Sequence, residues 1–138
     1  MNIQVVDTPR NETRIVFVSS GDTAKEIPDF EGKTGETTVR YDGETTYIYC
    51  GIGDPDGCTT EHIRSAAACG VRKAGLLKRS EVTVVEPTQL SNDGGPQAAL
   101  EGAILVAYRY AHFKTEKPVT VDRIDYVGNH LTDKDAMR

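Results

Sequence analysis

The order of secondary-structure signals predicts an α/β fold with a mixed β-sheet flanked by helices. Strand-like segments alternate with two long helical patterns along the 138 residues, an order typical of sheets with helices on their faces. The turn dipeptide Asp42-Gly43 separates two β-rich segments and predicts one antiparallel hairpin. A near-continuous apolar run at residues 14–19 indicates a strand buried on both faces.

Six segments carry strand signals, because they alternate in polarity or are rich in β-branched and aromatic residues. They are residues 3–6, 14–19, 36–41, 45–50, 81–85 and 119–127. Residues 20–35 are rich in Gly, Asp and Pro, which predicts a loop with a short helical piece near residues 23–27. We interpret the acidic residues of this loop as solvated surface; they are Asp22, Glu26, Asp29 and Glu31.

A first long helix is predicted at about residues 59–77. Thr59 or Thr60 can cap its start, and Glu61 suits its first turn. An apolar stripe at helical spacing predicts one buried face, formed by Ile63, Ala66, Ala67, Gly70, Val71, Ala74 and Leu77. Gly70 costs about 1 kcal/mol relative to Ala within a helix. A close approach of the helix to the sheet at Gly70 would explain its presence.

A second long helix, predicted at about residues 96–113, carries two adjoining apolar sectors. Pro96 suits its first position. The first sector comprises Leu100, Ala103, Ile104, Ala107, Tyr108 and Ala111. The second sector comprises Ala99, Gly102, Val106, Tyr110 and Phe113. One sector can lie on the sheet, whereas the other needs a further layer of this domain or another domain.

Composition predicts one soluble domain, with 38% hydrophobic and 27% charged residues. No apolar run approaches the roughly 20 residues of a membrane span, and the N-terminus lacks signal-peptide features, so we expect a cytoplasmic protein. The net charge of −5 argues against a nucleic-acid partner. A local basic cluster near the end of the first helix also suits the helix macrodipole; it consists of Arg72, Lys73, Lys78 and Arg79.

Two groups of residues have partial site character. Gly51-x-Gly53 with Gly57 lies between a strand and a helix, where glycines can cradle a phosphate. The intervening Asp54 and Asp56 oppose an anion, so we prefer a plain turn. The second group could supply soft zinc ligands and consists of Cys50, Cys58, His62 and Cys69. Its spacing matches no usual zinc pattern and the cysteine count is odd, so we prefer buried free cysteines.

The sequence shows no complete catalytic constellation. The three histidines, His62, His112 and His130, do not form a His-Glu-x-x-His motif, and no serine lies in a nucleophile elbow. Asp122 and Asp125 are three residues apart in a predicted strand, so they would face opposite sides. We therefore predict no catalytic, cofactor-binding or metal-binding residue in this chain.

Five motifs follow one another in a fixed order between residues 30 and 127. They are Gly32-Lys33-x-Gly35-Glu36-Thr37, a strand ending in Gly51-Ile52-Gly53, the helix at residues 59–70, Glu101-Gly102-Ala103-Ile104-Leu105-Val106-Ala107-Tyr108-Arg109-Tyr110 followed by Phe113-Lys114, and the strand at residues 119–127. In this order they resemble the N-terminal domain of the leucyl (cytosol) aminopeptidase family. Each motif is weak alone, and the ordered set carries the resemblance.

The resemblance implies a macro-domain-like three-layer fold in a single domain at residues 1–128. Residues 129–138 would be a polar tail or the start of a linker. In this family a separate C-terminal domain performs the peptidase chemistry with two metal ions, Zn or Mn, and carries the signature NTDAEGR. No such signature occurs in these 138 residues, so the resemblance places the metals in a catalytic domain that is absent here. Full-length relatives are homohexamers.

The resemblance therefore implies a non-catalytic accessory domain of a metal-dependent leucyl aminopeptidase. It would pack against the catalytic domain of the same parent chain and support assembly of the oligomer. Two alternatives remain open. One is a macro-like module that binds a nucleotide such as ADP-ribose, and the other is a DNA-binding accessory domain, since some family members bind DNA.

Overall fold

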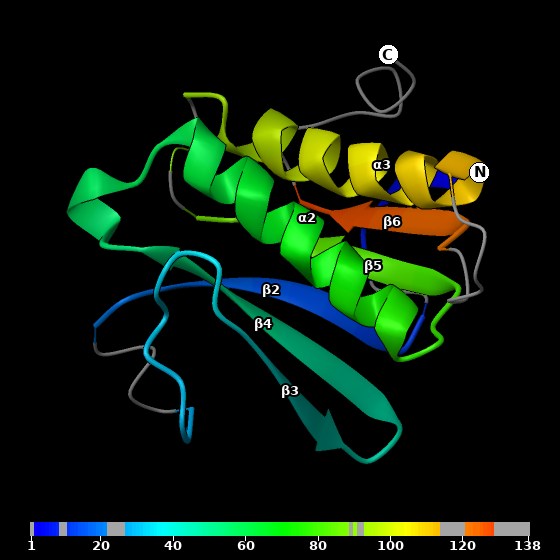
Figure 1. Cartoon of the computed structure of the whole chain (residues 1–138), viewed down its shortest axis with the longest axis horizontal. Helices are drawn as coiled ribbons and strands as arrows, with labels where there is room; N and C mark the ends of the chain where they lie inside the picture. Colours follow the sequence, from blue (N-terminus) through cyan, green and yellow to red (C-terminus); the bar gives the residue numbers. More distant parts are fainter. Residues whose placement is uncertain are drawn as a thin grey trace.

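The computed structural model describes residues 2–8, 11–21, 27–88, 90, 93–113 and 121–128, in which one six-stranded sheet carries two α-helices (Figure 1). The strands are β1 (Asn2–Val6), β2 (Thr13–Ser19), β3 (Thr37–Asp42), β4 (Thr45–Gly53), β5 (Glu81–Val85) and β6 (Arg123–Val127). The helices are α2 (Thr60–Leu76) and α3 (Gly95–Phe113), with a short 3₁₀ helix η1 (Pro55–Gly57). The strand order is β1-β6-β5-β2-β4-β3. The predicted α/β class with a mixed sheet is confirmed.

One hairpin interrupts an otherwise parallel sheet, as the sequence predicts. Strands β3 and β4 pair antiparallel, with Val39 opposite Ile48, whereas the other neighbouring strands pair parallel. Gly43 in the connecting turn has φ of 61°, a left-handed conformation that Gly adopts without strain. The Asp42-Gly43 signal therefore marks the turn correctly.

Helix α2 lies on the sheet along its predicted apolar stripe. Ile63, Val71 and Ala74 are fully buried. A Cβ atom added to Gly70 would lie 2.8 Å from Cys50 Sγ and 2.9 Å from Ile15 Cγ2. The predicted close approach at Gly70 is thus confirmed, because any larger residue would push the helix away from β2 and β4.

Helix α3 packs on both the sheet and α2. A Cβ atom added to Gly102 would lie 2.2 Å from the Arg64 carbonyl oxygen of α2, and Val106 is only 5% exposed. These two residues of the second apolar sector are therefore core within this domain. The side chains of Tyr110 and Phe113 lie outside the described residues. Leu105, which neither sector includes, is 63% exposed.

Both α-helices cover the same face of the sheet (Figure 1). In the described part of the chain, connecting segments cover the opposite face instead of a helix. Phe30 packs there against Val16, Val18 and Tyr49, and Asn11 Nδ2 donates to Asp125 Oδ2 at 3.4 Å. The predictions for residues 22–26, 114–120 and 129–138 lie outside the described residues.

The last strand begins later than predicted. Residues 119 and 120 are outside the described residues, and β6 begins at Arg123. The backbone N–H groups of Asp122 and Arg123 donate to the Ser80 carbonyl oxygen at 2.9 and 3.3 Å. These bonds tie residues 122 and 123 to the α2–β5 connection, and residues 121 and 122 lie outside β6, so the prediction was wrong at this end. Among the described residues, neither helix is long and apolar enough to cross a membrane.

Candidate functional site

The glycines of the possible phosphate cradle are occupied by the loop at residues 31–36. Gly51 N–H donates to the Glu36 carbonyl oxygen at 2.8 Å, and Gly53 N–H donates to the Gly32 carbonyl oxygen at 2.9 Å. A Cβ atom added to Gly51 would lie 2.0 Å from the Lys33 carbonyl oxygen. The N–H groups that a phosphate would need are already used, so the preferred reading of a structural turn fits the geometry.

The Glu36 carboxylate fixes this loop from within. Its Oε1 atom accepts from Lys33 N–H and from Glu31 N–H, both at 3.1 Å. Lys33 Nζ lies 2.6 Å from Glu31 Oε2, and this hydrogen bond and charge lower the pKa of the Glu31 carboxyl. The motif Gly32-Lys33-x-Gly35-Glu36 therefore forms a loop that is stabilised by the Glu36 carboxylate and that hydrogen-bonds through its backbone to the end of β4.

The Cys and His residues take structural positions instead of gathering around a metal. His62 caps its own helix: Thr59 N–H donates to His62 Nδ1, and His62 N–H donates to Thr59 Oγ1, both at 3.3 Å. Cys50 is completely buried, and burial, followed by the nearby Cys69, raises the pKa of its thiol. Within the described ranges, no three His, Cys, Asp or Glu residues form a metal-binding group. His112 and His130 lie outside the described side chains.

The motif Glu101-Gly102-Ala103 serves the crossing of α2 and α3. Arg64 Nη1 lies 2.6 Å from Glu61 Oε2 within α2, and Arg64 Nη2 lies 3.2 Å from Glu101 Oε1 on α3. Gly102 lets the helices approach beneath this ion-pair bridge, and Ala103 is fully buried. These residues therefore fix the position of one helix on the other.

Two buried polar groups near the C-terminal part of the sheet were not predicted. Asp125 is fully buried in β6; its Oδ1 atom lies 3.2 Å from Arg123 Nη2, an ion pair without hydrogen-bond geometry. Tyr126 OH donates to Glu86 Oε2 at 2.8 Å, and burial together with this bond raises the pKa of Tyr126. Asp122 precedes β6, so it does not share a strand with Asp125. An ionisable residue between Ile124 and Tyr126 was the available sequence signal.

The basic cluster predicted late in the first helix divides between two places. Arg72 and Lys73 belong to α2, whereas Lys78 and Arg79 follow its end. The latter two line a cavity with Glu12 and Glu81, at the amino ends of β2 and β5. None of the motifs that carry the family resemblance includes these four residues together.

Comparison with known proteins gives a consistent picture. The model of the "Cytosol aminopeptidase family, N-terminal domain" matches residues 10–117. A probable cytosol aminopeptidase from Synechococcus sp. is 38% identical over 89 residues, which make up 62% of this chain and 18% of the relative. A second, from Oleidesulfovibrio alaskensis, is 30% identical over 104 residues, covering 70% of this chain and 20% of the relative. The chain thus spans about a fifth of these curated relatives.

Solved structures share the fold at low sequence identity. A tomato leucine aminopeptidase mutant superposes with a TM-score of 0.75 at 14% identity, covering 99% of this chain and 35% of that chain. The bottromycin maturation enzyme BotP gives a TM-score of 0.65 at 18% identity, covering 91% of this chain and 29% of that chain. Each match involves only part of a longer protein.

Proposed function

Because this chain belongs to the cytosol aminopeptidase family, in which it corresponds to the N-terminal domain, we propose that it is a non-catalytic accessory domain of a metal-dependent leucyl aminopeptidase. The observation that carries the proposal is the family match over residues 10–117, on a chain that spans about a fifth of its curated relatives. The peptidase chemistry and its divalent metals, Zn or Mn, then belong to a catalytic domain of the same parent chain.

The geometry supports this assignment through the use of the family motifs. The Gly32 to Glu36 loop holds the end of β4, and Glu101 and Gly102 fix α3 on α2. Residues that make a rigid scaffold suit a domain that packs against another and supports a homohexamer. The family's name supports a cytoplasmic location.

A turnover assay tests the proposal. We expect the purified chain to release no chromophore from a leucine-derived chromogenic amide with added Mn²⁺ or Zn²⁺. The full-length Synechococcus relative serves as positive control under the same conditions. Metal-dependent turnover by this chain, abolished by a chelator, would overturn the accessory role.

The gene provides a second, independent test. We expect the codons beyond Arg138 to continue into a catalytic domain with the metal-binding signature of the family. A stop codon directly after Arg138 would remove the same-chain catalytic domain from the proposal.

A further inference from the structure

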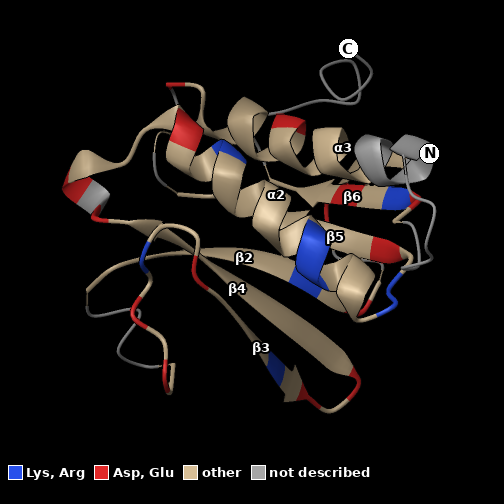
Figure 2. Ribbon diagram, viewed as in Figure 1, with Lys and Arg blue, Asp and Glu red and all other residues tan. Residues whose placement is uncertain are grey.

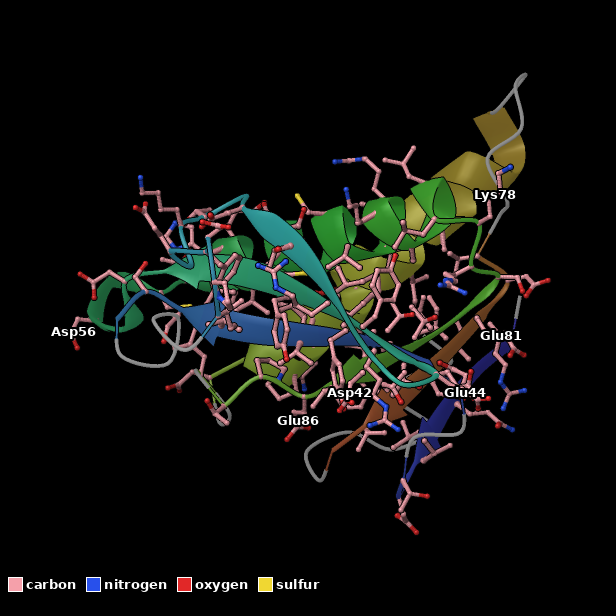
Figure 3. The ribbon with its side chains drawn as sticks, turned by 90° about the horizontal axis from the view of Figure 1, so that it is seen from below. Asp42, Glu44, Asp56, Lys78, Glu81 and Glu86 are labelled. Atoms are coloured by element: carbon pink, nitrogen blue, oxygen red, sulfur yellow. The ribbon has the colours of Figure 1, made fainter. Side chains whose placement is uncertain are left out.

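A polar cavity lies at the amino ends of β2 and β5, where the turn after α2 leads into β5. It is an open depression of about 440 Å³, and the residues Glu12, Lys78 and Glu81 that line it are exposed to solvent. Four charged side chains, two of each sign, line it: Glu12, Lys78, Arg79 and Glu81. Figure 2 shows basic residues in the turn after α2 and an acidic residue at the start of β5. In Figure 3, Lys78 and Glu81 lie at the same end of the domain.

Among the described residues, Arg79 is the one charged side chain of this cavity that forms a hydrogen bond within the fold. None of the four cavity residues takes part in the ion pairs that Lys33, Arg64 and Arg123 form within the described part of the chain. Arg79 Nη2 donates to Thr46 Oγ1 at 3.3 Å, but its buried Nε–H has no acceptor. A buried donor without an acceptor is costly, so the fold does not fully satisfy the guanidinium group of Arg79.

The backbone at the cavity is also unusual. The end of α2 forms a Schellman motif, in which Lys78 N–H donates to the Gly75 carbonyl oxygen at 3.0 Å and Arg79 N–H to that of Ala74 at 2.9 Å. Lys78 occupies the left-handed position of this motif with φ of 62°, where Gly is the usual residue. Strained residues of this kind gather at functional sites, and here the strained residue brings an ammonium group to the cavity.

We propose that this cavity binds a small zwitterion, specifically a free α-amino acid. Its carboxylate pairs with Arg79 and Lys78, and its ammonium group pairs with Glu12 and Glu81. A simple anion would meet the two carboxylates, and a simple cation would meet Lys78 and Arg79. Only a ligand with both charges matches both pairs.

The site is separate from the possible phosphate cradle. Ligands of open α/β sheets usually bind beyond the carboxyl ends of the strands, where Gly51 and Gly53 are occupied by the Gly32 to Glu36 loop. The cavity lies at the opposite ends of the strands, beside Thr13 and Glu81. Its assignment depends on these charges alone and does not require the parent aminopeptidase.

Amide chemical-shift titration of the full chain tests the proposal with four probes: L-alanine, L-alaninamide, propionate and inorganic phosphate. L-alanine carries both charges, whereas the amide has only the cation, and propionate and phosphate have only the anion. We expect saturable shifts at residues 11–13 and 78–81 with L-alanine, with a dissociation constant in the millimolar range. The other probes are expected to bind about tenfold more weakly or not at all.

Two variants and a control separate binding from folding. Lys78→Gly removes the ammonium group while suiting the left-handed backbone, so it should fold and bind L-alanine about tenfold more weakly. Glu81→Gln should weaken L-alanine binding similarly by removing one partner of the ligand ammonium. Lys73→Gln removes a cation from α2 outside the cavity and should leave binding unchanged. Absence of saturable shifts with L-alanine, or an equal response to propionate or phosphate, overturns the proposal.

Discussion

The two ends of the parallel strands differ in how completely their polar groups are satisfied. At the carboxyl ends, Gly51 and Gly53 donate to the loop at residues 31–36, whose own turn is fixed by the Glu36 carboxylate. At the amino ends, Arg79 Nε lacks an acceptor, and Glu81 with the other charged residues of the cavity forms no ion pair within the described residues.

This difference separates polar residues that stabilise the fold from polar residues that have no ion-pair partner within its described part. Where the family motifs occur, the glycines and charged residues contact other parts of the same domain and stabilise its fold. Where no motif drew attention, the charged residues that line the cavity form no ion pair within the described residues, and they carry the proposed amino-acid site. The motifs belong to the scaffold of the family, whereas the charges without ion pairs belong to the proposed ligand site.

The largest expected effect at the carboxyl ends of the parallel strands comes from Gly51→Ala. The new Cβ atom would lie 2.0 Å from the Lys33 carbonyl oxygen and 2.7 Å from the Gly32 carbonyl carbon, so the loop must move and lose its bonds to β4. We expect the free energy of unfolding in urea to fall by about 3 kcal/mol or more.

Gly57→Ala is the matched control for Gly51→Ala. A Cβ atom there has no neighbour within 4 Å, so we expect a change below about 1 kcal/mol. If Gly51→Ala unfolded at the same urea concentration as this control, the loop at residues 31–36 would not be rigidly packed at the carboxyl ends of the strands.

A smaller effect follows from the buried thiol beside Gly51. Burial and the nearby Cys69 raise the pKa of Cys50 above its ordinary value of 9.0, so the folded state keeps a proton that the unfolded state loses. Its contribution to stability is therefore full below pH 9 and declines above it, by about 1.4 kcal/mol per pH unit. Urea unfolding under reducing conditions between pH 8 and pH 10 measures this slope.

Cys50→Ala distinguishes the thiol from other alkaline effects. The variant should be less stable at every pH, because a buried sulfur is lost, but its stability should decline less steeply between pH 9 and pH 10. Tyr126, whose pKa is also raised above an ordinary value of 10.0, contributes mainly at higher pH. An unchanged slope in the variant would assign the decline to groups other than Cys50.

The smallest expected effect is a gain in stability from a substitution at the amino ends of β2 and β5. Lys78→Gly removes the side chain from a left-handed position with φ of 62°, so we expect the free energy of unfolding to rise by about 0.5–1 kcal/mol. Lys73→Gly, inside the last turn of α2, should instead lower it by about 1 kcal/mol. Equal losses in both variants would show that Lys78 is not strained.

Local signals predicted much of the fold. Asp42-Gly43 gave the hairpin, and the apolar stripe with Gly70 gave the position of α2 on the sheet. These features depend on neighbouring residues, so their physical cause is visible in a short window of sequence. The family resemblance was likewise confirmed by the match over residues 10–117.

Features that depend on distant partners were not predictable in the same way. The role of Gly51 requires the loop around Lys33, and the second sector of α3 requires the backbone of Arg64. The segment just before β6 is held by hydrogen bonds from Asp122 and Arg123 to the Ser80 carbonyl oxygen, a partner more than 40 residues away. The cavity combines residues that precede β2 with residues that precede β5. These two segments are far apart in the sequence, and no spacing pattern predicts that they lie close together.

The pairing of β1 with β6 has a consequence for synthesis on the ribosome. Residue Ile3 pairs with Ile124 only near the end of the described chain, and β1 has no other neighbour among the described strands of the sheet. At about 5–20 residues per second, the nascent β1 strand remains unpaired for roughly 6–24 seconds before that partner is synthesised. Polar Asn2 and Gln4 alternate with apolar Ile3 and Val5 along β1, so one face of the unpaired strand is polar there, which limits aggregation.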